Sequence, residues 1–409
     1  MRRVLKILGL VVAAVALLIG GFAVYVAVDG IPRYPVEKVD LRVEATPVRV
    51  ARGKKLAMLL CANCHLNPTT RQLTGKQMAD APPEFGVIFS PNITRHLKKG
   101  IGSWTDGELA YLLRTGVKRD GQYTPPWMAK LPHASDEDLA SIIAFLRSDD
   151  PMVAAADVDP PGVTRPTFLS KFLSHTVFKK LPFPREPIAA PPLSDKVAHG
   201  RYLVVALDCF PCHSADFKTM NVWEPEKSVG YLGGGNTVLD LRGHPIRSAN
   251  LTPDEETGIG RWSEQDFRRA MRSGFRPDRS PIRYPMSPTP ELSDEELGAM
   301  YAYLRTVPKI RNAVPRPPPP TGAMASLSVG QRLYEAYSCS SCHGDNGVGI
   351  ADLRQAAEHY PTRAKLKAWI KDAPSIKPDT RMPAWDGVVA EEEYDALIDY
   401  VLELGARRR

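Results

Sequence analysis

The longest apolar stretch of the chain lies at its N-terminus. Residues 7–28 are uncharged and mostly apolar, and an α-helix of this length spans about 30 Å, the hydrocarbon thickness of a bilayer. Arg2, Arg3 and Lys6 precede the stretch, so the positive-inside rule places the N-terminus in the cytoplasm. We predict a single-pass anchor over residues 1–28 in a cell inner membrane, with the rest of the chain in the periplasm.

A cleaved signal peptide is the alternative interpretation of the same stretch. The apolar region of a signal peptide runs about 7–15 residues, and this one is longer. No convincing small-x-small cleavage site follows it. An uncleaved anchor is therefore the preferred interpretation, and both interpretations export the chain.

Amphipathic periodicity further along the chain predicts helices rather than strands. Leu139, Ile142, Ile143 and Leu146 recur at i, i+3, i+4 and i+7, which is the pattern of one apolar helix face. Ser135 precedes them as an N-cap, followed by acidic residues in the first turn. The expected fold is mainly α.

An internal repeat relates the region around residues 92–147 to the region around 250–305 without a gap. The matching pairs include Asn92-Ile93-Thr94 with Asn250-Leu251-Thr252, Trp104 with Trp262, Arg114 with Arg272, Gly116 with Gly274, Met128 with Met286, and Ser135 with Ser293. Each copy is predicted to contain a first helix, a loop region, a short helix between Trp104 and Gly116 or their equivalents, a Pro-flanked segment and a last helix. The second copy has extra residues around Tyr231–Gly243, a Gly-rich stretch that predicts a loop. A third, shorter copy keeps only the skeleton.

All six cysteines lie in three copies of one motif. The copies are Cys61-Ala62-Asn63-Cys64-His65, Cys209-Phe210-Pro211-Cys212-His213 and Cys339-Ser340-Ser341-Cys342-His343. The spacing C-x-x-C-H is typical of covalent haem attachment. Two thiols three residues apart reach the two vinyl groups of one porphyrin, and the following imidazole reaches the iron. We therefore predict three haem c groups, held by these six cysteines, with His65, His213 and His343 as proximal ligands.

Three other uses of the cysteines are less consistent with the pattern. A zinc site needs paired motifs and two further ligands for each metal. A thioredoxin-like redox pair does not require the following histidine. Structural disulfides would not repeat one spacing three times.

The sixth ligand of each iron is predicted to be a methionine. Met128, Met286 and Met382 each lie next to a proline and before the last helix of their copy. A thioether ligand raises the haem potential and suits electron transfer, and proline stiffens the loop that would hold it. The rivals within the first copy are Met78, His96 and His133.

Other repeated polar and aromatic residues leave two interpretations open. The tryptophans and asparagines line the haem edge or bond a propionate, or else they serve packing and turn geometry. The arginines neutralise propionates or lie on a solvated helix face. The residues concerned are Trp104, Trp262, Asn92, Asn250, Arg114 and Arg272.

Composition and charge exclude one class of partner. The chain has a formal net charge of +7, but its Lys and Arg residues are scattered and form no basic stripe with interleaved aromatics. We therefore expect no nucleic-acid partner. The basic balance suits an acidic partner surface or anionic lipid headgroups, or is ordinary solvated charge. The 38 prolines favour turns, linkers and interrupted helices.

These patterns predict three tandem domains after the anchor. The expected boundaries are 1–28 for the transmembrane anchor, 49–150 for domain one, 151–192 for a Pro-rich linker, 193–309 for domain two, 310–323 for a second Pro-rich linker and 324–409 for domain three. The second linker contains Pro317-Pro318-Pro319-Pro320, a run typical of polyproline II. A short amphipathic piece near 168–178 is expected to cross a neighbouring domain or to touch the membrane surface.

Domains one and two resemble the multihaem cytochrome c subunit of bacterial membrane-bound dehydrogenases that oxidise alcohol, aldehyde, gluconate or fructose. The matching segments are Asn250-Leu251-Thr252-Pro253-Asp254, Thr257-Gly258-Ile259-Gly260 with Trp262, and Tyr284-Pro285-Met286. The third domain resembles a generic small class I cytochrome c. The resemblance implies three class I cytochrome c domains that take electrons from a partner dehydrogenase and pass them to ubiquinone or another acceptor.

The leading functional prediction is electron transfer, with no catalysis by this chain alone. Histidine and methionine on every iron would leave no coordination site for a substrate. The expected redox partners are a dehydrogenase subunit, a quinol-oxidising complex or a terminal oxidase. The alternative is a catalytic, peroxidase-like multihaem cytochrome in which one haem is open.

Overall fold

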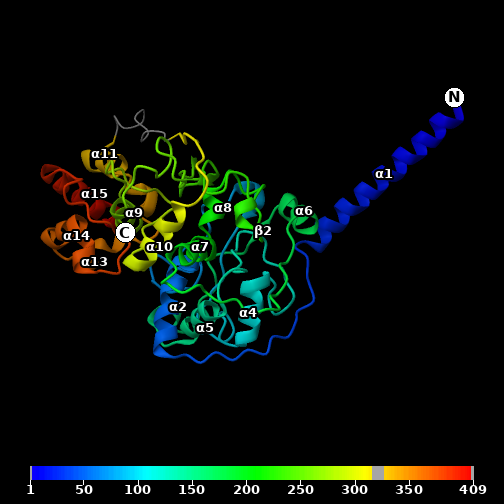
Figure 1. Ribbon diagram of the computed structural model, residues 1–409, viewed down its shortest axis with the longest axis horizontal. Coiled ribbons are helices and arrows are strands. Elements are labelled where there is room, and N and C mark those ends of the chain that lie inside the picture. Colours follow the sequence, from blue (N-terminus) through cyan, green and yellow to red (C-terminus); the bar gives the residue numbers. More distant parts are fainter. Residues whose placement is uncertain (1, 316–326, 407–409) are drawn as a thin grey trace.

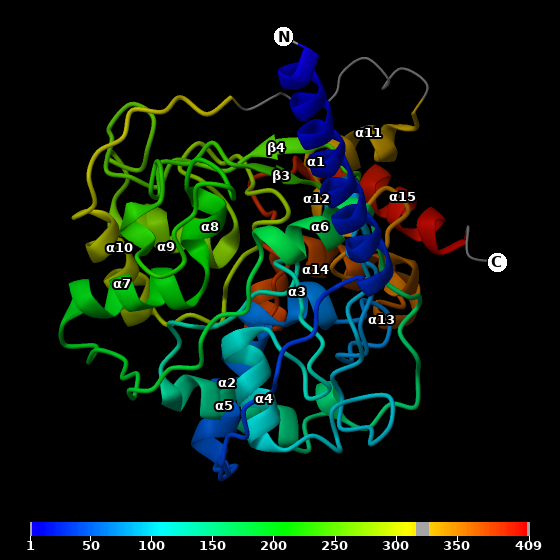
Figure 2. The same cartoon turned by 90° about the vertical axis from the view of Figure 1, so that its right-hand side faces the viewer.

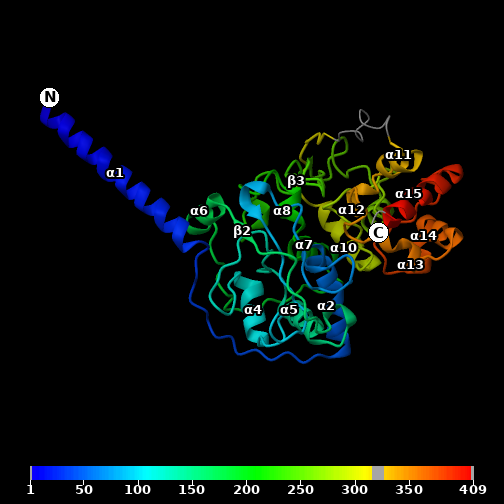
Figure 3. The same ribbon diagram turned by 180° about the vertical axis from the view of Figure 1, so that it is seen from behind.

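The computed structural model describes residues 2–315 and 327–406 (Figure 1). The predicted polyproline run therefore lies outside the described residues. Helix α1 (Arg2–Asp29) projects away from the body (Figures 1 and 3). It is long and apolar enough to cross a membrane, although a signal sequence near the N-terminus would meet the same criteria. An anchor at this position stays a prediction.

The body is mainly helical, as predicted, and is built on three pairs of helices. In each pair the first helix of a repeat packs against the last helix of the same repeat. The pairs are α2 (Pro47–Leu60) with α5 (Asp136–Arg147), α7 (Lys196–Ala206) with α10 (Asp294–Leu304), and α11 (Val329–Ala336) with α15 (Tyr394–Ala406). Three separate apolar cores surround these pairs.

A glycine lies at the crossing point of every pair. A Cβ atom on Gly53 would lie 1.8 Å from the Ser141 carbonyl oxygen, and one on Gly200 would lie 1.9 Å from that of Ala299. In the third pair, a Cβ atom on Gly330 would lie 2.1 Å from the carbonyl oxygen of Ala396. The backbones of the paired helices thus approach so closely that only glycine fits.

We expect Gly200→Ala to separate helices α7 and α10. The obstructing atom is a backbone oxygen that cannot rotate away, and overpacking a core costs about 1–3 kcal/mol. Gly298→Ala on α10 is the matched control, because its Cβ would meet only the flexible ends of the Glu264 and Arg268 side chains. Denaturant unfolding of both variants checks the prediction, and equal stabilities would contradict it.

Shorter helices complete each unit. The predicted helix before Gly116 is confirmed as α4 (Asp106–Thr115), which starts with a Thr105–Glu108 capping box and ends at Gly116 with φ of 80°. Its repeat equivalent is α9 (Glu264–Ser273), which has the same two devices. The remaining helices are α6 (Phe168–Thr176), α13 (Ala356–His359) and α14 (Arg363–Ile376). The 3₁₀ turns are η1 (Pro83–Phe85), η2 (Pro151–Val153), η3 (Pro225–Lys227), η5 (Leu353–Gln355) and η6 (Glu391–Glu393).

Two small antiparallel strand pairs hold loops in place. Strand β1 (Gly86–Val87) pairs with β2 (Arg165–Pro166), which fastens the long linker to the first unit. Strands β3 (Thr237–Leu239) and β4 (Pro245–Arg247) form a hairpin. The prediction of a plain loop around Tyr231–Gly243 is therefore wrong for its second half, which pairs with the residues that follow it.

The three units are packed side by side rather than strung out in a line (Figures 1 and 2). Phe275 of the second unit belongs to the apolar core of the third, where its ring meets Trp385 edge-on at 5.0 Å. Lys55 on α2 pairs with Glu296 on α10 across the first two units. The third unit also contacts the first, through a 2.8 Å hydrogen bond from Thr69 to Asp352. These contacts hold the three units together as one body.

Candidate haem sites

Each C-x-x-C-H motif lies on a one-turn helix that follows the first helix of its unit after a sharp bend. These turns are α3 (Ala62–His65), α8 (Cys209–His213) and α12 (Ser340–His343). Asp208 and Ser338 make the bend in the second and third units with φ of 61° and 58°, a left-handed conformation that a short polar residue such as aspartate tolerates. The turn places both cysteines and the histidine of each motif on one compact piece of backbone.

All three motif histidines direct Nδ1 at a backbone carbonyl. The partners are Pro91 for His65 at 2.9 Å, Ala249 for His213 at 2.8 Å, and Ala351 for His343 at 3.4 Å. A carbonyl only accepts, so Nδ1 carries the proton and the lone pair lies on Nε2. This arrangement fixes the ring and is the usual outer-shell support of a metal-binding histidine. Burial also lowers the pKa of each imidazole, which favours the neutral form that binds a metal.

The motif thiols lie in apolar surroundings. Burial raises the pKa of Cys61 to about 12 and that of Cys64 to about 11. It raises the pKa of Cys209, Cys212 and Cys339 to about 12 as well. All six cysteines are partly exposed, but thiols with raised pKa values are weak nucleophiles. Among the described residues, no three His, Cys, Asp or Glu side chains gather as a metal cluster would require.

The repeated asparagines hold the segment whose carbonyl supports the histidine. Asn92 follows Pro91 directly, and its side-chain amide donates to the carbonyls of Ala156 and Val158, both at 3.0 Å. Asn250 follows Ala249 in the same way and donates to Ile310 at 2.7 Å. Both are at least 96% buried. Of the two interpretations left open for these residues, the structure therefore supports the structural one.

The three predicted methionine ligands, Met128, Met286 and Met382, are all half-buried. Each lies in a loop between the middle and last helices of its unit. Arg114 stabilises the loop of the first unit, because its guanidinium donates to the carbonyls of Leu131 and Ala134 at 2.7 and 2.6 Å. Its side chain is 1% exposed and also pairs with Asp136 at the start of α5.

Arg272 repeats this arrangement in the second unit. It donates to the carbonyl of Leu292 at 2.9 Å and pairs with Asp294 at 2.8 Å. The Arg272 side chain is 41% exposed, so the solvated-face interpretation describes Arg272 but not the buried Arg114. Both residues also contact the segment that connects the methionine to the last helix.

The two rival histidines of the first unit have other partners. His96 accepts at Nδ1 from the Lys99 amide at 3.0 Å within its own turn. His133 contacts the Val222 carbonyl of the second unit through Nε2 at 2.5 Å. Trp104 and Trp262 pack against the cores of their units. The two thiols of each motif and its imidazole with Nε2 available fit a c-type haem.

Arg381 joins the third unit to the first haem motif. It directly precedes Met382, and its guanidinium donates to the Asn63 side chain at 3.3 Å and to the Met58 carbonyl. Its third partner is Glu291 of the second unit at 3.0 Å, with side-chain exposures of 11% and 9%. One cation therefore contacts all three units, between two of the predicted metal sites.

A second junction lies close by. Tyr284, two residues before Met286, donates to the Asp80 carboxylate of the first unit at 2.8 Å. Burial raises the pKa of Tyr284, and the charge of Asp80 with its hydrogen bond raises it further. Arg381 and Tyr284 thus mark a common centre at which the three units meet.

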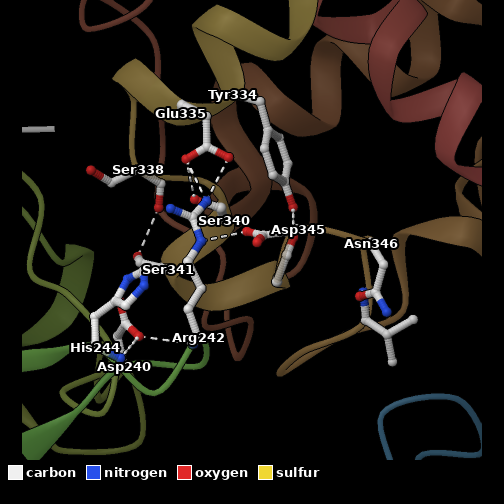
Figure 4. Close-up of polar contacts among 12 residues, drawn as sticks. Asp240, Arg242, His244, Tyr334, Glu335, Ser338, Ser340, Ser341, Asp345 and Asn346 are labelled. Carbon is white, nitrogen blue, oxygen red and sulfur yellow. Dashed lines mark hydrogen bonds and ion pairs between the residues drawn. The ribbon is translucent and has the colours of Figure 1, made fainter. Parts of the chain in front are cut away.

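The β3–β4 hairpin links the second unit to the third haem motif (Figure 4). Arg242 at its tip lies between Glu335 at 2.6 Å and Asp345 at 2.5 Å. Glu335 also accepts a 2.9 Å hydrogen bond from Ser340, which lies between the two cysteines of that motif. The stretch that distinguishes the second repeat from the first thus also contacts the third unit.

Comparisons with known protein families agree with this description. The family model described as "Cytochrome c" matches residues 50–149, and the model described as "Cytochrome C oxidase, cbb3-type, subunit III" matches residues 325–401. The chain therefore carries c-type cytochrome domains, the class of protein whose haem transfers electrons.

Similar proteins indicate which kind of c-type cytochrome the chain resembles. It is 29% identical to the cytochrome c subunit of the quinone-type alcohol dehydrogenase of Gluconobacter oxydans over 75% of this chain, and 32% identical to the fructose dehydrogenase cytochrome subunit of Gluconobacter japonicus over 74%. It is 27% identical to the gluconate 2-dehydrogenase cytochrome c subunit of Pantoea cypripedii over 78% of this chain and 74% of that protein. The chain spans 66% and 65% of the first two relatives. It is homologous to the cytochrome c subunits of membrane-bound alcohol, fructose and gluconate dehydrogenases.

Proposed function

We propose that the chain transfers electrons through three covalently bound c-type haems, each with histidine and methionine as axial ligands, on the periplasmic side of the membrane. The observation that carries the proposal is the repetition of one ligand arrangement. In all three units a Cys pair is followed by a histidine whose Nδ1 contacts a carbonyl, and a half-buried methionine lies before the last helix.

The haem would supply an iron that gains and loses one electron, and the chain's residues would set how readily it does so. His65, His213 and His343 would bind through Nε2, with the carbonyl at Nδ1 increasing their basicity. Met128, Met286 and Met382 would bind on the opposite side and raise the potential. Ligands on both sides leave no position for a substrate, which argues against the peroxidase-like alternative.

The common centre supports direct exchange among the three haems. Arg381 contacts the first motif and adjoins the third methionine, while Tyr284 adjoins the second methionine and contacts the first unit. Electrons would then be able to pass between any two haems instead of following the order of the chain. A rigid junction would also keep the distances between haems constant.

The partner would be a dehydrogenase. The relatives are named as subunits of alcohol, fructose and gluconate dehydrogenases, and by homology this chain would accept electrons from a catalytic subunit of that kind. Anchoring by α1 would hold it beside a membrane acceptor such as a quinone. A respiratory carrier between a quinol-oxidising complex and a terminal oxidase remains the other use of the same sites.

Purification of the full chain from membranes tests the proposal. We expect three haems per chain, low-spin spectra, a band near about 695 nm from methionine–iron ligation, and a co-purifying dehydrogenase subunit that reduces the haems when given its substrate. A native high-spin fraction that binds carbon monoxide would favour the catalytic alternative. Fewer than three haems per chain would refute the assignment of one motif.

A further inference from the structure

We propose that helix α6 lies in the interfacial layer of the same membrane that α1 crosses, and so forms a second membrane contact that orients the body. This inference rests on the proposed anchor. Helix α6 belongs to the linker between the first two units, and β1 and β2 fasten it to the first unit. Figures 1 and 3 show it beside the last turns of α1, at the edge of the body from which α1 projects.

Aromatic and polar contacts join the two helices. The Phe172 ring meets Phe22 edge-on at 6.1 Å, and the His175 ring meets Tyr25 at 5.3 Å. Lys171 donates from Nζ to the Ala27 carbonyl at 3.2 Å. Helix α6 is therefore fixed against the end of α1 and cannot move far from the plane in which α1 leaves the bilayer.

The depth of these contacts matches the interfacial layer. With a rise of about 1.5 Å per residue, Phe22 lies about 9 Å deeper along α1 than Val28, the last apolar residue before Asp29. Interfacial helices bury their apolar face about 5–10 Å into the boundary between headgroups and acyl chains. Phe172, which touches Phe22, falls at this depth.

On helix α6 polar residues face the body and apolar residues face outward, which is the reverse of a helix on a water-exposed surface. Ser170 and Ser174 are fully buried against the body, where Ser170 donates to the Phe85 carbonyl at 2.7 Å. Phe168 and Leu169 point outward with exposures of 49% and 43%. In water this orientation would leave apolar area exposed, which is unfavourable, whereas a lipid surface would cover it.

Neighbouring apolar residues extend this face into a patch around the end of α1. Val177 follows α6 directly with 64% exposure, and Val163 precedes β2 with 77%. Val87 on β1 pairs with Arg165 on β2 and is 46% exposed. The exposed Lys179 follows the helix as a cation suited to phosphate headgroups, whereas Lys180 pairs with Glu37 and Tyr111. The continuity of the patch with α1 favours the lipid surface as its occupant over a second polypeptide.

Photo-crosslinking of the full haem-loaded chain in phosphatidylethanolamine–phosphatidylglycerol nanodiscs tests the inference. The probe is benzoylphenylalanine, placed singly at Leu169, at Val15 within α1, or at Ile376 of α14. Ile376 is 56% exposed and lies at the far end of the body from α1 (Figures 1 and 3). We expect phospholipid adducts at Leu169 and Val15, several-fold above the level at Ile376, in the mass spectra.

The outcomes separate the two proposals. A lipid adduct at Val15 with only background at Leu169 would refute the role of α6 while leaving the anchor intact. A polypeptide adduct at Leu169 in native membranes, together with loss of lipid crosslinking there, would assign the patch to a partner or a second copy and also overturn the inference. The absence of lipid adducts at both positions would overturn the proposed anchor itself.

Discussion

Replacing Met286 with alanine should turn one of the three haems into a high-spin, carbon-monoxide-binding centre. The iron would keep His213, which Ala249 holds in place, but the opposite position would be open to water or an added ligand. The potential of that haem would fall, because the thioether stabilises the reduced iron. Electronic and electron paramagnetic resonance spectra of the purified variant measure the change.

Met300→Leu is the matched control for this variant. Met300 is 2% exposed within the second apolar core, and a swap of similar volume costs less than about 1.5 kcal/mol. The Met300→Leu variant should keep three low-spin haems and the full band at about 695 nm. If Met286→Ala also kept all three low-spin signals, Met286 would not be a ligand, and another side chain would have to be sought.

Replacing Arg381 with alanine should loosen the junction of the three units. Glu291, which is 9% exposed, would then remain buried opposite no cation, and its Oε2 atom already has no hydrogen-bond partner. Removing one partner of a buried ion pair costs about 3–5 kcal/mol. The loss should appear as a lower denaturant midpoint and as faster proteolysis between the second and third units.

Two further variants separate this effect from a general loss of charge. Arg363 pairs with Asp399 on the surface, where the side chains are 47% and 67% exposed, and Arg363→Ala should cost less than about 1 kcal/mol. Adding Glu291→Gln to Arg381→Ala should restore part of the stability, because the buried charge is removed. If Arg381→Ala proved as mild as Arg363→Ala, the junction would not hold the units together.

The features that could be predicted from the sequence are those with a local signal. The short helix α4 could be predicted between Trp104 and Gly116 because the internal repeat places Trp262 and Gly274 at the same spacing. The mainly helical fold could be predicted from apolar periodicity. The haem motifs could be recognised because covalent attachment requires one fixed spacing.

The contacts that could not be predicted are made to backbone carbonyls or to residues distant in the sequence. Arg114 repeats as Arg272, which signals a shared constraint, but their partners are mainly backbone carbonyls, which every residue possesses. The same holds for the carbonyls that support the histidines. Arg242 at the hairpin tip binds carboxylates about a hundred residues away in the sequence. The sequence around Arg242 does not identify these partners.

The contact between Arg381 and Asn63 also constrains biogenesis. These residues are 318 positions apart, so the last unit to be synthesised packs against the first motif. Burial raises the pKa of the Cys61 and Cys64 thiols, and thioether formation requires a reactive thiol. We therefore expect haem attachment at the first motif to precede docking of the third unit. Folding of the C-terminal third of the chain before attachment would hinder maturation of the protein.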